Sequence, residues 1–210
     1  MNKEKINKIF EIFEFDDPAP KTELNYKNDY TLLVAIVLSA QATDVGVNKA
    51  TKKLFEVVES PDKMIDLGEQ GLKEYIKTIG LYNSKAKNVI ELSRNLIDQH
   101  EGNVPDNFDD LIKLPGVGRK TTNVFLNCFY GVDTIGVDTH VFRVANRTGI
   151  TKAKNTEQSE KQLLKKIPKQ CRKYAHHWLI LHGRYVCKAR KPDCKSCKIL
   201  DLCEYKEKVM

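Results

Sequence analysis

The chain has 210 residues, 41% hydrophobic and 30% charged, which is enough to bury the core of one domain or two small ones and is not a disordered composition. The longest apolar run, YTLLVAIVLSA at 30–40, is 11 residues long, well short of the roughly 20 that a membrane-spanning helix needs. A formal net charge of +7 suggests a polyanionic partner without identifying one.

The N-terminal segment is predicted to be an amphipathic helix. Ile6, Ile9, Phe10 and Phe13 recur at helical spacing among charged residues, and the Pro-rich segment 17–20 ends the pattern. Without a continuous apolar stretch or a small-residue cleavage site, the segment does not resemble a secretory signal. We therefore expect a cytoplasmic protein that has no membrane partner.

The next part of the chain also predicts helices. Residues 30–40 are expected to form a buried central helix, and Asp44 is expected to cap a helix that runs to about residue 58. Two short helices are predicted at 63–67 and 72–78, before Gly80.

Helical patterns continue to residue 185. Ser84 is expected to cap a long helix that ends near residue 100. Further helices are predicted at 109–113, 119–130, 138–149, 157–166 and 174–185. Because period-2 alternation is nearly absent, the predicted fold class is all-α.

A glycine-containing turn, LPGVGRK, lies between two of these helices. It comprises Leu114, Pro115, Gly116, Val117, Gly118, Arg119 and Lys120. Two glycines permit a tight turn that leads into a helix N-terminus, where free N–H groups favour a phosphate. The pattern matches a helix-hairpin-helix, whose amides bind a DNA phosphate without reading sequence. An ordinary corner between two helices is the alternative.

Two residues near this turn have side chains that suit catalysis. Lys120 lies in the first turn of its helix, and a lysine with a neutral amine can act as a nucleophile. Asp138 precedes another helix, and a plain N-cap explains it equally well. Neither residue is identified as catalytic by these properties alone.

Four cysteines follow a C-x6-C-x2-C-x5-C pattern: Cys187, Cys194, Cys197 and Cys203. Only one tight pair is present, whereas zinc ribbons usually have two, so the wider spacing favours a 4Fe–4S cluster over zinc. The remaining cysteines, Cys128 and Cys171, are expected to be buried small hydrophobic residues.

The positive charge is concentrated towards the C-terminus. Residues 140–210 contain 18 Lys and Arg against 6 Asp and Glu, whereas residues 1–139 contain 17 against 22. This asymmetry suggests nucleic acid or membrane contact, and a lysine-rich solvated surface is the alternative. The basic loop 188–193 could contact phosphates or compensate the charge of cysteine thiolates.

Taken in order along the chain, these motifs resemble the endonuclease III family. The likeness rests on LPGVGRKT at 114–121, VDTHVFRVANRTG at 137–149 and the four cysteines. SAQATD at 39–44 and GLYNSKAKN at 80–88 are similar as well. The resemblance covers essentially the whole chain.

The resemblance implies the helix-hairpin-helix DNA glycosylase fold, with two helical domains flanking a DNA-binding cleft. One is a six-helix domain at 22–132 that includes the helix-hairpin-helix at about 109–130. The other combines 1–21 with 133–210 and contains the cluster loop 187–203. We expect a monomer that binds one 4Fe–4S cluster.

The resemblance also implies a bifunctional enzyme of base excision repair. Such a glycosylase removes oxidised or ring-damaged pyrimidines from double-stranded DNA and cleaves abasic sites as a lyase. Lys120 matches the family's nucleophile, which forms a Schiff base before β-elimination. Asp138 matches its essential carboxylate.

Further positions match residues that contact DNA in the family. Gln41 and Leu81 match the residues that fill the space left by the flipped nucleotide, although Leu81 could be core packing. Lys191 is the candidate for a phosphate contact in the cluster loop. Ser39, Asp44 and His140 match positions near the lesion pocket.

Three other proteins would share some of these features. Monofunctional adenine-mismatch glycosylases have the hairpin, aspartate and cluster, but they lack the lysine and usually have an additional C-terminal domain. Mismatch thymine glycosylases usually lack the lysine too. A non-enzymatic iron–sulfur DNA-binding sensor would leave Lys120 and Asp138 without a role.

Overall fold

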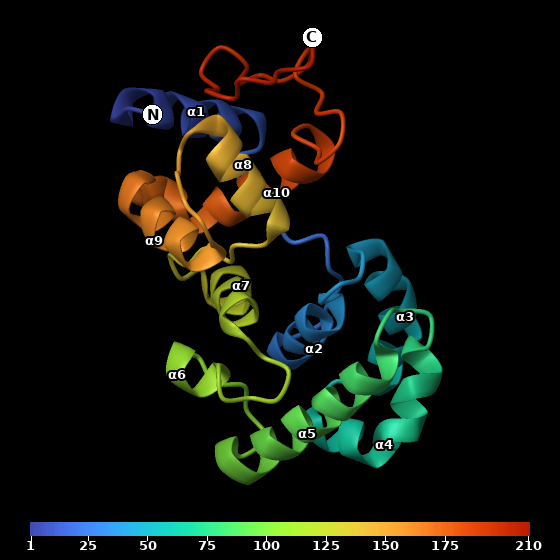
Figure 1. Cartoon of the computed structure of the whole chain (residues 1–210). Coiled ribbons are helices and arrows are strands. Elements are labelled where there is room, and N and C mark those ends of the chain that lie inside the picture. The colour runs from blue at the N-terminus through green and yellow to red at the C-terminus, as the bar shows by residue number, and fades with distance from the viewer. The chain divides into compact units, whose positions relative to one another are not determined.

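The computed structural model describes all 210 residues, which fold into helices without strands (Figure 1). The all-α prediction is confirmed. None of the helices has the length and apolar character needed to cross a membrane. The chain divides into two compact units: unit 1 comprises Met1–Lys21 and Gly131–Met210, and unit 2 comprises Thr22–Tyr130.

Unit 2 is built around a helix that is buried on all sides. Its helices are α2 (Asp29–Ser39), α3 (Asp44–Val57), α4 (Pro61–Ile76), α5 (Tyr82–His100), α6 (Phe108–Leu111) and α7 (Arg119–Tyr130). All residues of α2 from Tyr30 to Leu38 are buried, because the segment is apolar on every face. Helices α3, α5 and α7 pack around α2, and α4 lies along α5 (Figure 1).

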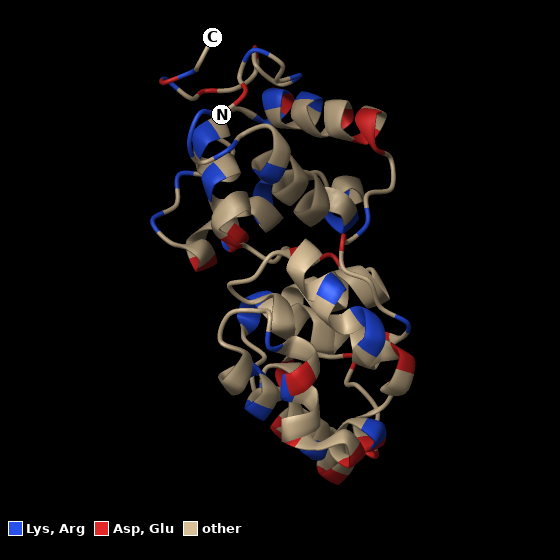
Figure 2. Cartoon of the chain, turned by 90° about the vertical axis from the view of Figure 1, so that its right-hand side faces the viewer, with Lys and Arg blue, Asp and Glu red and all other residues tan.

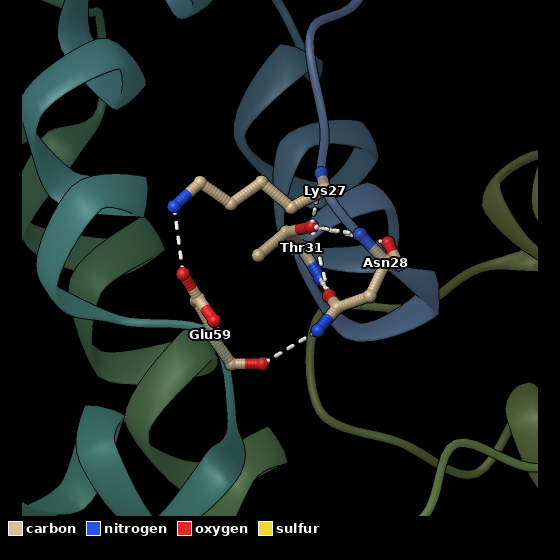
Figure 3. A network of polar contacts seen from close by, with 4 residues as sticks. All are labelled: Lys27, Asn28, Thr31 and Glu59. Carbon is tan, nitrogen blue, oxygen red and sulfur yellow. Dashed lines mark hydrogen bonds and ion pairs between the residues drawn. The ribbon is translucent and has the colours of Figure 1, made fainter.

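The start of α2 is fixed by a polar network (Figure 3). The Asn28 side chain accepts a hydrogen bond from the Thr31 amide at 2.9 Å, and the Thr31 hydroxyl accepts one from the Asn28 amide at 2.9 Å. This capping box satisfies the first amides of the helix. Asn28 also donates to the Glu59 carbonyl at 2.8 Å, and Lys27 forms an ion pair with the Glu59 carboxylate at 2.7 Å.

The expected helix starts need two corrections. Thr43, not Asp44, caps α3, because its hydroxyl accepts a hydrogen bond from the Gly46 amide at 3.1 Å. Ser84 is not a cap but an internal residue of α5, which begins after Leu81 with no side-chain cap.

The two short helices expected at 63–67 and 72–78 are the two parts of α4, which lie on either side of a kink. Its backbone is interrupted at Gly68, where φ is 71° and ψ is 167°. The short helix expected at 109–113 begins one residue earlier, at Phe108, and is capped by Asn107.

Unit 1 brings together the two ends of the chain. It contains α1 (Lys3–Asp16), α8 (Thr139–Thr148), α9 (Thr156–Lys166), the 3-10 helix η1 (Lys169–Cys171) and α10 (Arg172–Tyr185). Apolar residues of α1, α8 and α10 share its core, as expected for Phe10 and Phe13. The indole N–H of Trp178 donates to the Asp17 carbonyl at 2.8 Å.

Polar contacts also hold the C-terminal segment of unit 1. Lys198 forms an ion pair with Asp16 at 2.6 Å, and the amino group of Met1 forms one with Glu204 at 3.3 Å. Residues 140–210, with 18 of the chain's 35 Lys and Arg residues, all belong to this unit. Figure 2 shows basic residues distributed along the ribbon of both units, and acidic residues at the C-terminal end of α1.

Candidate functional site

The hairpin turn at 114–118 is anchored by its two apolar residues. Leu114 is 2% exposed and Val117 6%, so these predicted DNA-contacting side chains belong to the core of unit 2. The Val117 amide donates to the Leu114 carbonyl at 3.0 Å and closes the turn. Any contact of these two residues with DNA would therefore involve backbone groups.

Gly116 requires the absence of a side chain. Its φ is 76°, and an added Cβ would lie 3.0 Å from the Cβ of Asn88 on α5. A non-glycine residue would meet both backbone strain and a steric contact. Gly118 has no atom near the corresponding position. The turn therefore packs closely against α5 at Gly116, whereas space for a side chain remains at Gly118.

The end of the turn exposes the start of α7. Pro115 is half-buried, and Gly116 and Gly118 are exposed. The first intrahelical hydrogen bond is the one from the Thr122 amide to the Gly118 carbonyl at 3.0 Å. The amides of Lys120 and Thr121 in the first turn of this 12-residue helix are therefore available to an anion.

Lys120 is exposed in the first turn of α7. No ion pair or hydrogen bond holds its ammonium group, so the side chain can reach a bound molecule. Its neighbour Arg119 is also exposed, and its guanidinium lies over the Phe108 ring at 5.2 Å from the centroid. This contact gives Arg119 a defined position beside the turn.

Gln41 and Leu81 share an unusual backbone conformation. Both are exposed, with φ of 53° and 60° in the left-handed region. A Cβ on Gly80, next to Leu81, would lie 3.8 Å from the Gln41 carbonyl, so the two loops of unit 2 are neighbours. Non-glycine residues adopt this conformation at a cost, and such residues cluster at functional sites. At 58% exposure, Leu81 is not a core residue.

Asp138 is the N-cap of α8, as its sequence context predicts. Its Oδ1 accepts hydrogen bonds from the amides of His140 and Val141, both at 2.8 Å. The flanking residues Val137 and Val141 are buried, which fixes the backbone at this point. No hydrogen bond engages Oδ2, so this half-buried carboxylate has an oxygen available to a ligand.

The other candidate pocket residues are partly buried. Ser39 ends α2, and its hydroxyl donates to the Ile36 carbonyl at 2.8 Å. Asp44 is the first residue of α3. His140 lies in the first turn of α8, where its Nδ1 is 3.2 Å from the Arg143 guanidinium. Ser39 and Asp44 belong to unit 2 and His140 to unit 1.

The four cysteines of the C-terminal motif line one pocket of unit 1. Its other walls are largely apolar and include Val186, Pro192, Ile199 and Leu200. No three metal-binding side chains converge on the position of a single ion. Cys171 is buried outside this pocket, and Cys128 is half-buried against the core of unit 2.

The pocket is unfavourable to the charge of its own thiolates. Burial raises the pKa of Cys197 and of Cys203, and in each case the charges of neighbouring cysteines act in the same direction. The His182 Nε2 lies 3.7 Å from the Cys197 sulfur. A bound cationic centre would offset this repulsion, since metals bind the deprotonated thiol.

Two arginines of α8, which sequence reasoning overlooked, hold the first part of this segment. Arg147 donates to the carbonyls of Lys188 at 2.7 Å and Ala189 at 3.1 Å. Arg143 donates to the carbonyl of Cys187 at 3.0 Å. Their spacing of four residues on one helix face was the available signal.

Lys191 is exposed in the loop that these arginines support, and its φ is 50°. The following residue, Pro192, is buried and forms part of the cysteine pocket. The loop therefore presents Lys191 from an anchored and conformationally restricted backbone.

A family model and curated relatives that span nearly the whole chain show the family to which it belongs. Residues 34–169 match the HhH-GPD superfamily of base excision DNA repair proteins. Endonuclease III of Rickettsia felis is 60% identical over 205 residues, which is 98% of this chain and 96% of the relative. Endonuclease III of Escherichia coli K12 is 57% identical over 209 residues, which is 100% of this chain and 99% of the relative.

A solved structure of a trapped covalent endonuclease III–DNA intermediate, an estranged-adenine complex, has a similar fold. It superposes with a TM-score of 0.91 at 44% identity, covering 97% of this chain and 96% of that one.

Proposed function

The chain belongs to the endonuclease III family of the HhH-GPD superfamily, and on this premise we propose how its own residues perform the family's reaction. It is a DNA glycosylase of base excision repair with an associated abasic-site lyase activity. Its substrates are oxidised or ring-damaged pyrimidines and abasic sites in double-stranded DNA, and it acts as a monomer.

Lys120 is the nucleophile. Its neutral amine attacks C1′ of the damaged nucleotide, and the glycosidic electron pair leaves with the base, which takes up a proton. Opening of the sugar leaves a Schiff base between Lys120 and C1′. Loss of the C2′ proton then expels the 3′ phosphate and breaks the strand. The observation that carries this assignment is the exposed, unpaired ammonium group of Lys120 at the start of α7.

Asp138 stabilises the positive charge that develops on the sugar. Its Oδ1 is committed to the amides of His140 and Val141, which holds the carboxylate in one orientation. Its Oδ2 remains available to the substrate. A preoriented carboxylate stabilises a developing cation without reorganising during the reaction.

Gln41 and Leu81 maintain the DNA while the damaged nucleotide is outside the stack. Extruding a nucleotide costs a few kcal/mol, which contacts in the vacated space can offset. Leu81, exposed and apolar, inserts as a wedge between base pairs, and Gln41 hydrogen-bonds the orphaned base. Ser39, Asp44 and His140 contribute to the lesion pocket.

The backbone amides of Gly116 and Gly118 and the Lys191 side chain bind phosphates of the DNA backbone. The amides precede the first hydrogen bond of α7, and Lys191 lies on an anchored loop. Neither type of contact reads sequence.

The cysteine pocket holds one 4Fe–4S cluster. Its four cysteines line a common pocket, and only Cys194 and Cys197 form the tight pair of which zinc ribbons usually have two. A four-iron cluster takes one thiolate at each of four separate irons. When bound, the cluster would cross-link residues 187–203 through the four cysteine thiolates.

The two units of the chain are the two domains of the family. Unit 1 comprises Met1–Lys21 and Gly131–Met210, and unit 2 comprises Thr22–Tyr130.

The test uses a duplex that contains thymine glycol, with sodium borohydride to reduce a Schiff base. The wild type is expected to form a covalent protein–DNA adduct, and Lys120→Ala is expected to form none. Lys77→Ala is the matched control, because Lys77 is exposed in the same unit and pairs only with Glu74. It should form as much adduct as the wild type.

The same assay separates the alternatives. Base removal without an adduct would favour a monofunctional glycosylase. Failure to remove any damaged base would favour a non-enzymatic DNA-binding protein. An undiminished adduct in Lys120→Ala would overturn the role of Lys120.

A further inference from the structure

The first turn of α5 lacks the side-chain cap that opens α1, α2, α3, α4, α8 and α9. Leu81 precedes the helix in a left-handed conformation and caps no amide. The first intrahelical bond is donated by the Lys85 amide to the Leu81 carbonyl at 3.0 Å. The amides of Tyr82, Asn83 and Ser84 therefore have no acceptor within the helix.

Lys85 lies in this same turn with an unpartnered ammonium group. The residue is only 4% exposed, and its Nζ is buried without a hydrogen-bond partner. Helical side chains tilt towards the N-terminus, so the Lys85 stem covers the first turn of α5. A buried, unpaired cation beside the positive end of a helix dipole is unfavourable on both counts.

A bound anion would remove both penalties. It would accept hydrogen bonds from the free amides, and its charge would balance that of Lys85. Burial lowers the pKa of Lys85, as expected for an ammonium group without a counter-charge. Asn83 and Ser84 are exposed, which leaves the turn open to an anion from solution.

The position of the turn indicates which anion this is. Leu81, immediately before it, is the exposed residue assigned above as the DNA wedge. Asn88, one turn further along α5, lies beside Gly116 of the hairpin turn, because a Cβ added to Gly116 would be 3.0 Å from the Asn88 Cβ. The first turn of α5 thus lies between two elements of unit 2 that are assigned to DNA.

We propose that the first turn of α5 is a second phosphate-binding point for the DNA backbone. The amides of Tyr82, Asn83 and Ser84 donate hydrogen bonds to a phosphate oxygen, and the Lys85 ammonium group neutralises the phosphate charge from beneath the turn. This inference rests on the proposed function and deepens it, because it adds a DNA contact that no hairpin residue supplies.

The test compares Lys85→Met with Lys87→Met. Both remove one positive charge from α5, but Lys87 is exposed and pairs with Glu91 at 3.8 Å. Affinity for a duplex with a non-cleavable abasic analogue is measured as a function of salt. Lys85→Met is expected to weaken binding and to reduce the slope of log affinity against log salt by about 0.9, the value for one phosphate. Lys87→Met should keep the wild-type slope.

Thermal unfolding adds a readout that a purely structural lysine would not share. Replacing a buried unpaired amine by a thioether of similar shape should raise the Tm of Lys85→Met. Higher stability together with weaker DNA binding is the expected result. Wild-type affinity and slope in Lys85→Met, or an equal loss in Lys87→Met, would overturn the proposal.

If Lys85→Met instead unfolds more easily, Lys85→Arg decides the matter. Arginine keeps the positive charge. A wild-type slope of log affinity against log salt in Lys85→Arg would support the phosphate contact, and a reduced slope would overturn it. Each variant should still form the borohydride adduct at saturating DNA. An adduct missing from the wild type would be a failure of the proposed function, not of the Lys85 contact.

Discussion

The two units hold their candidate functional residues in different ways. In unit 2, Gln41, Leu81 and Gly116 have left-handed backbones that are held by helices packed around the fully buried α2. In unit 1, the cysteine segment after α10 has no helix of its own and is held by polar contacts from Arg143 and Arg147. Strained geometry needs a rigid support, and an apolar core provides one without any bound group.

The difference shows what holds the candidate functional residues of each unit in place. In unit 2 packing holds them, so its sites should persist whatever is bound. The cysteine pocket of unit 1 contains half-buried thiols whose charged forms repel each other, so its order should depend on the bound cluster. The following predictions test this contrast, from the largest expected effect to the smallest.

Loss of the cluster should affect unit 1 alone. Cys194→Ser in the full chain is expected to lose iron and amide-exchange protection at 187–203 and in α8, because cluster binding contributes to folding free energy. Protection in α2 should be unchanged. Hydrogen exchange with mass spectrometry measures both.

Cys171→Ala is the control, since Cys171 is buried in unit 1 but does not line the cysteine pocket. It should keep its iron. Equal loss of protection in α2 and in 187–203 after Cys194→Ser would show that the contrast between the units is wrong.

Asp138 allows the catalytic and capping roles to be separated. Asp138→Asn keeps a capping oxygen and should leave stability nearly unchanged, whereas Asp138→Ala should lose about 1 kcal/mol. Both variants lose the carboxylate charge, so both should excise the base roughly 100–1000-fold more slowly. Single-turnover excision and denaturant unfolding give the two quantities. An active Asp138→Asn would limit this residue to capping.

Gly116 and Gly118 form a matched pair for the packing of the hairpin turn. Gly116→Ala introduces strain at a φ of 76° and a contact with Asn88, and should cost about 1–3 kcal/mol. Gly118→Ala meets no neighbouring atom and should have little effect on stability. Denaturant unfolding compares them. Equal losses would mean that the turn is not held by its contact with α5.

Lys191→Glu tests the proposed phosphate contact of an exposed side chain that does not pack in the core. Because the residue is exposed, the variant should fold with wild-type stability but bind duplexes of every sequence more weakly. The slope of log affinity against log salt should fall by about 0.9 or more. Lys154→Glu, a reversal at another exposed lysine of unit 1, is the control. Equal weakening by both would assign the effect to net charge.

The sequence predicts the helices better than it predicts their surroundings. Helix α7 begins and ends where its pattern indicates, and Asp138 caps α8 as expected, because both signals are local. The start of α5 was missed because Leu81 adopts a left-handed backbone that its residue type does not indicate. Burial of Lys85 and Leu114 depends on tertiary packing, and the local pattern gave no sign of it.

The smallest effect is expected at the start of α2, where a surface ion pair supplements the packing. The hydrogen bond and charge of Lys27 lower the pKa of the Glu59 carboxyl below its ordinary value of 4.5. The stabilisation is therefore present above that value and is lost as pH falls through the lower pKa of the folded state. Because Glu59 is exposed, the Tm should decrease only slightly across this range, and less so at high salt. Glu59→Gln should remove this part of the pH dependence of the Tm while keeping the hydrogen bond from Asn28 to the backbone carbonyl of residue 59. Glu74→Gln, which breaks a different exposed ion pair, should leave this part of the pH dependence unchanged. If Glu59→Gln instead lowered the Tm strongly at neutral pH, the support of α2 would depend on charge as well as on its apolar core.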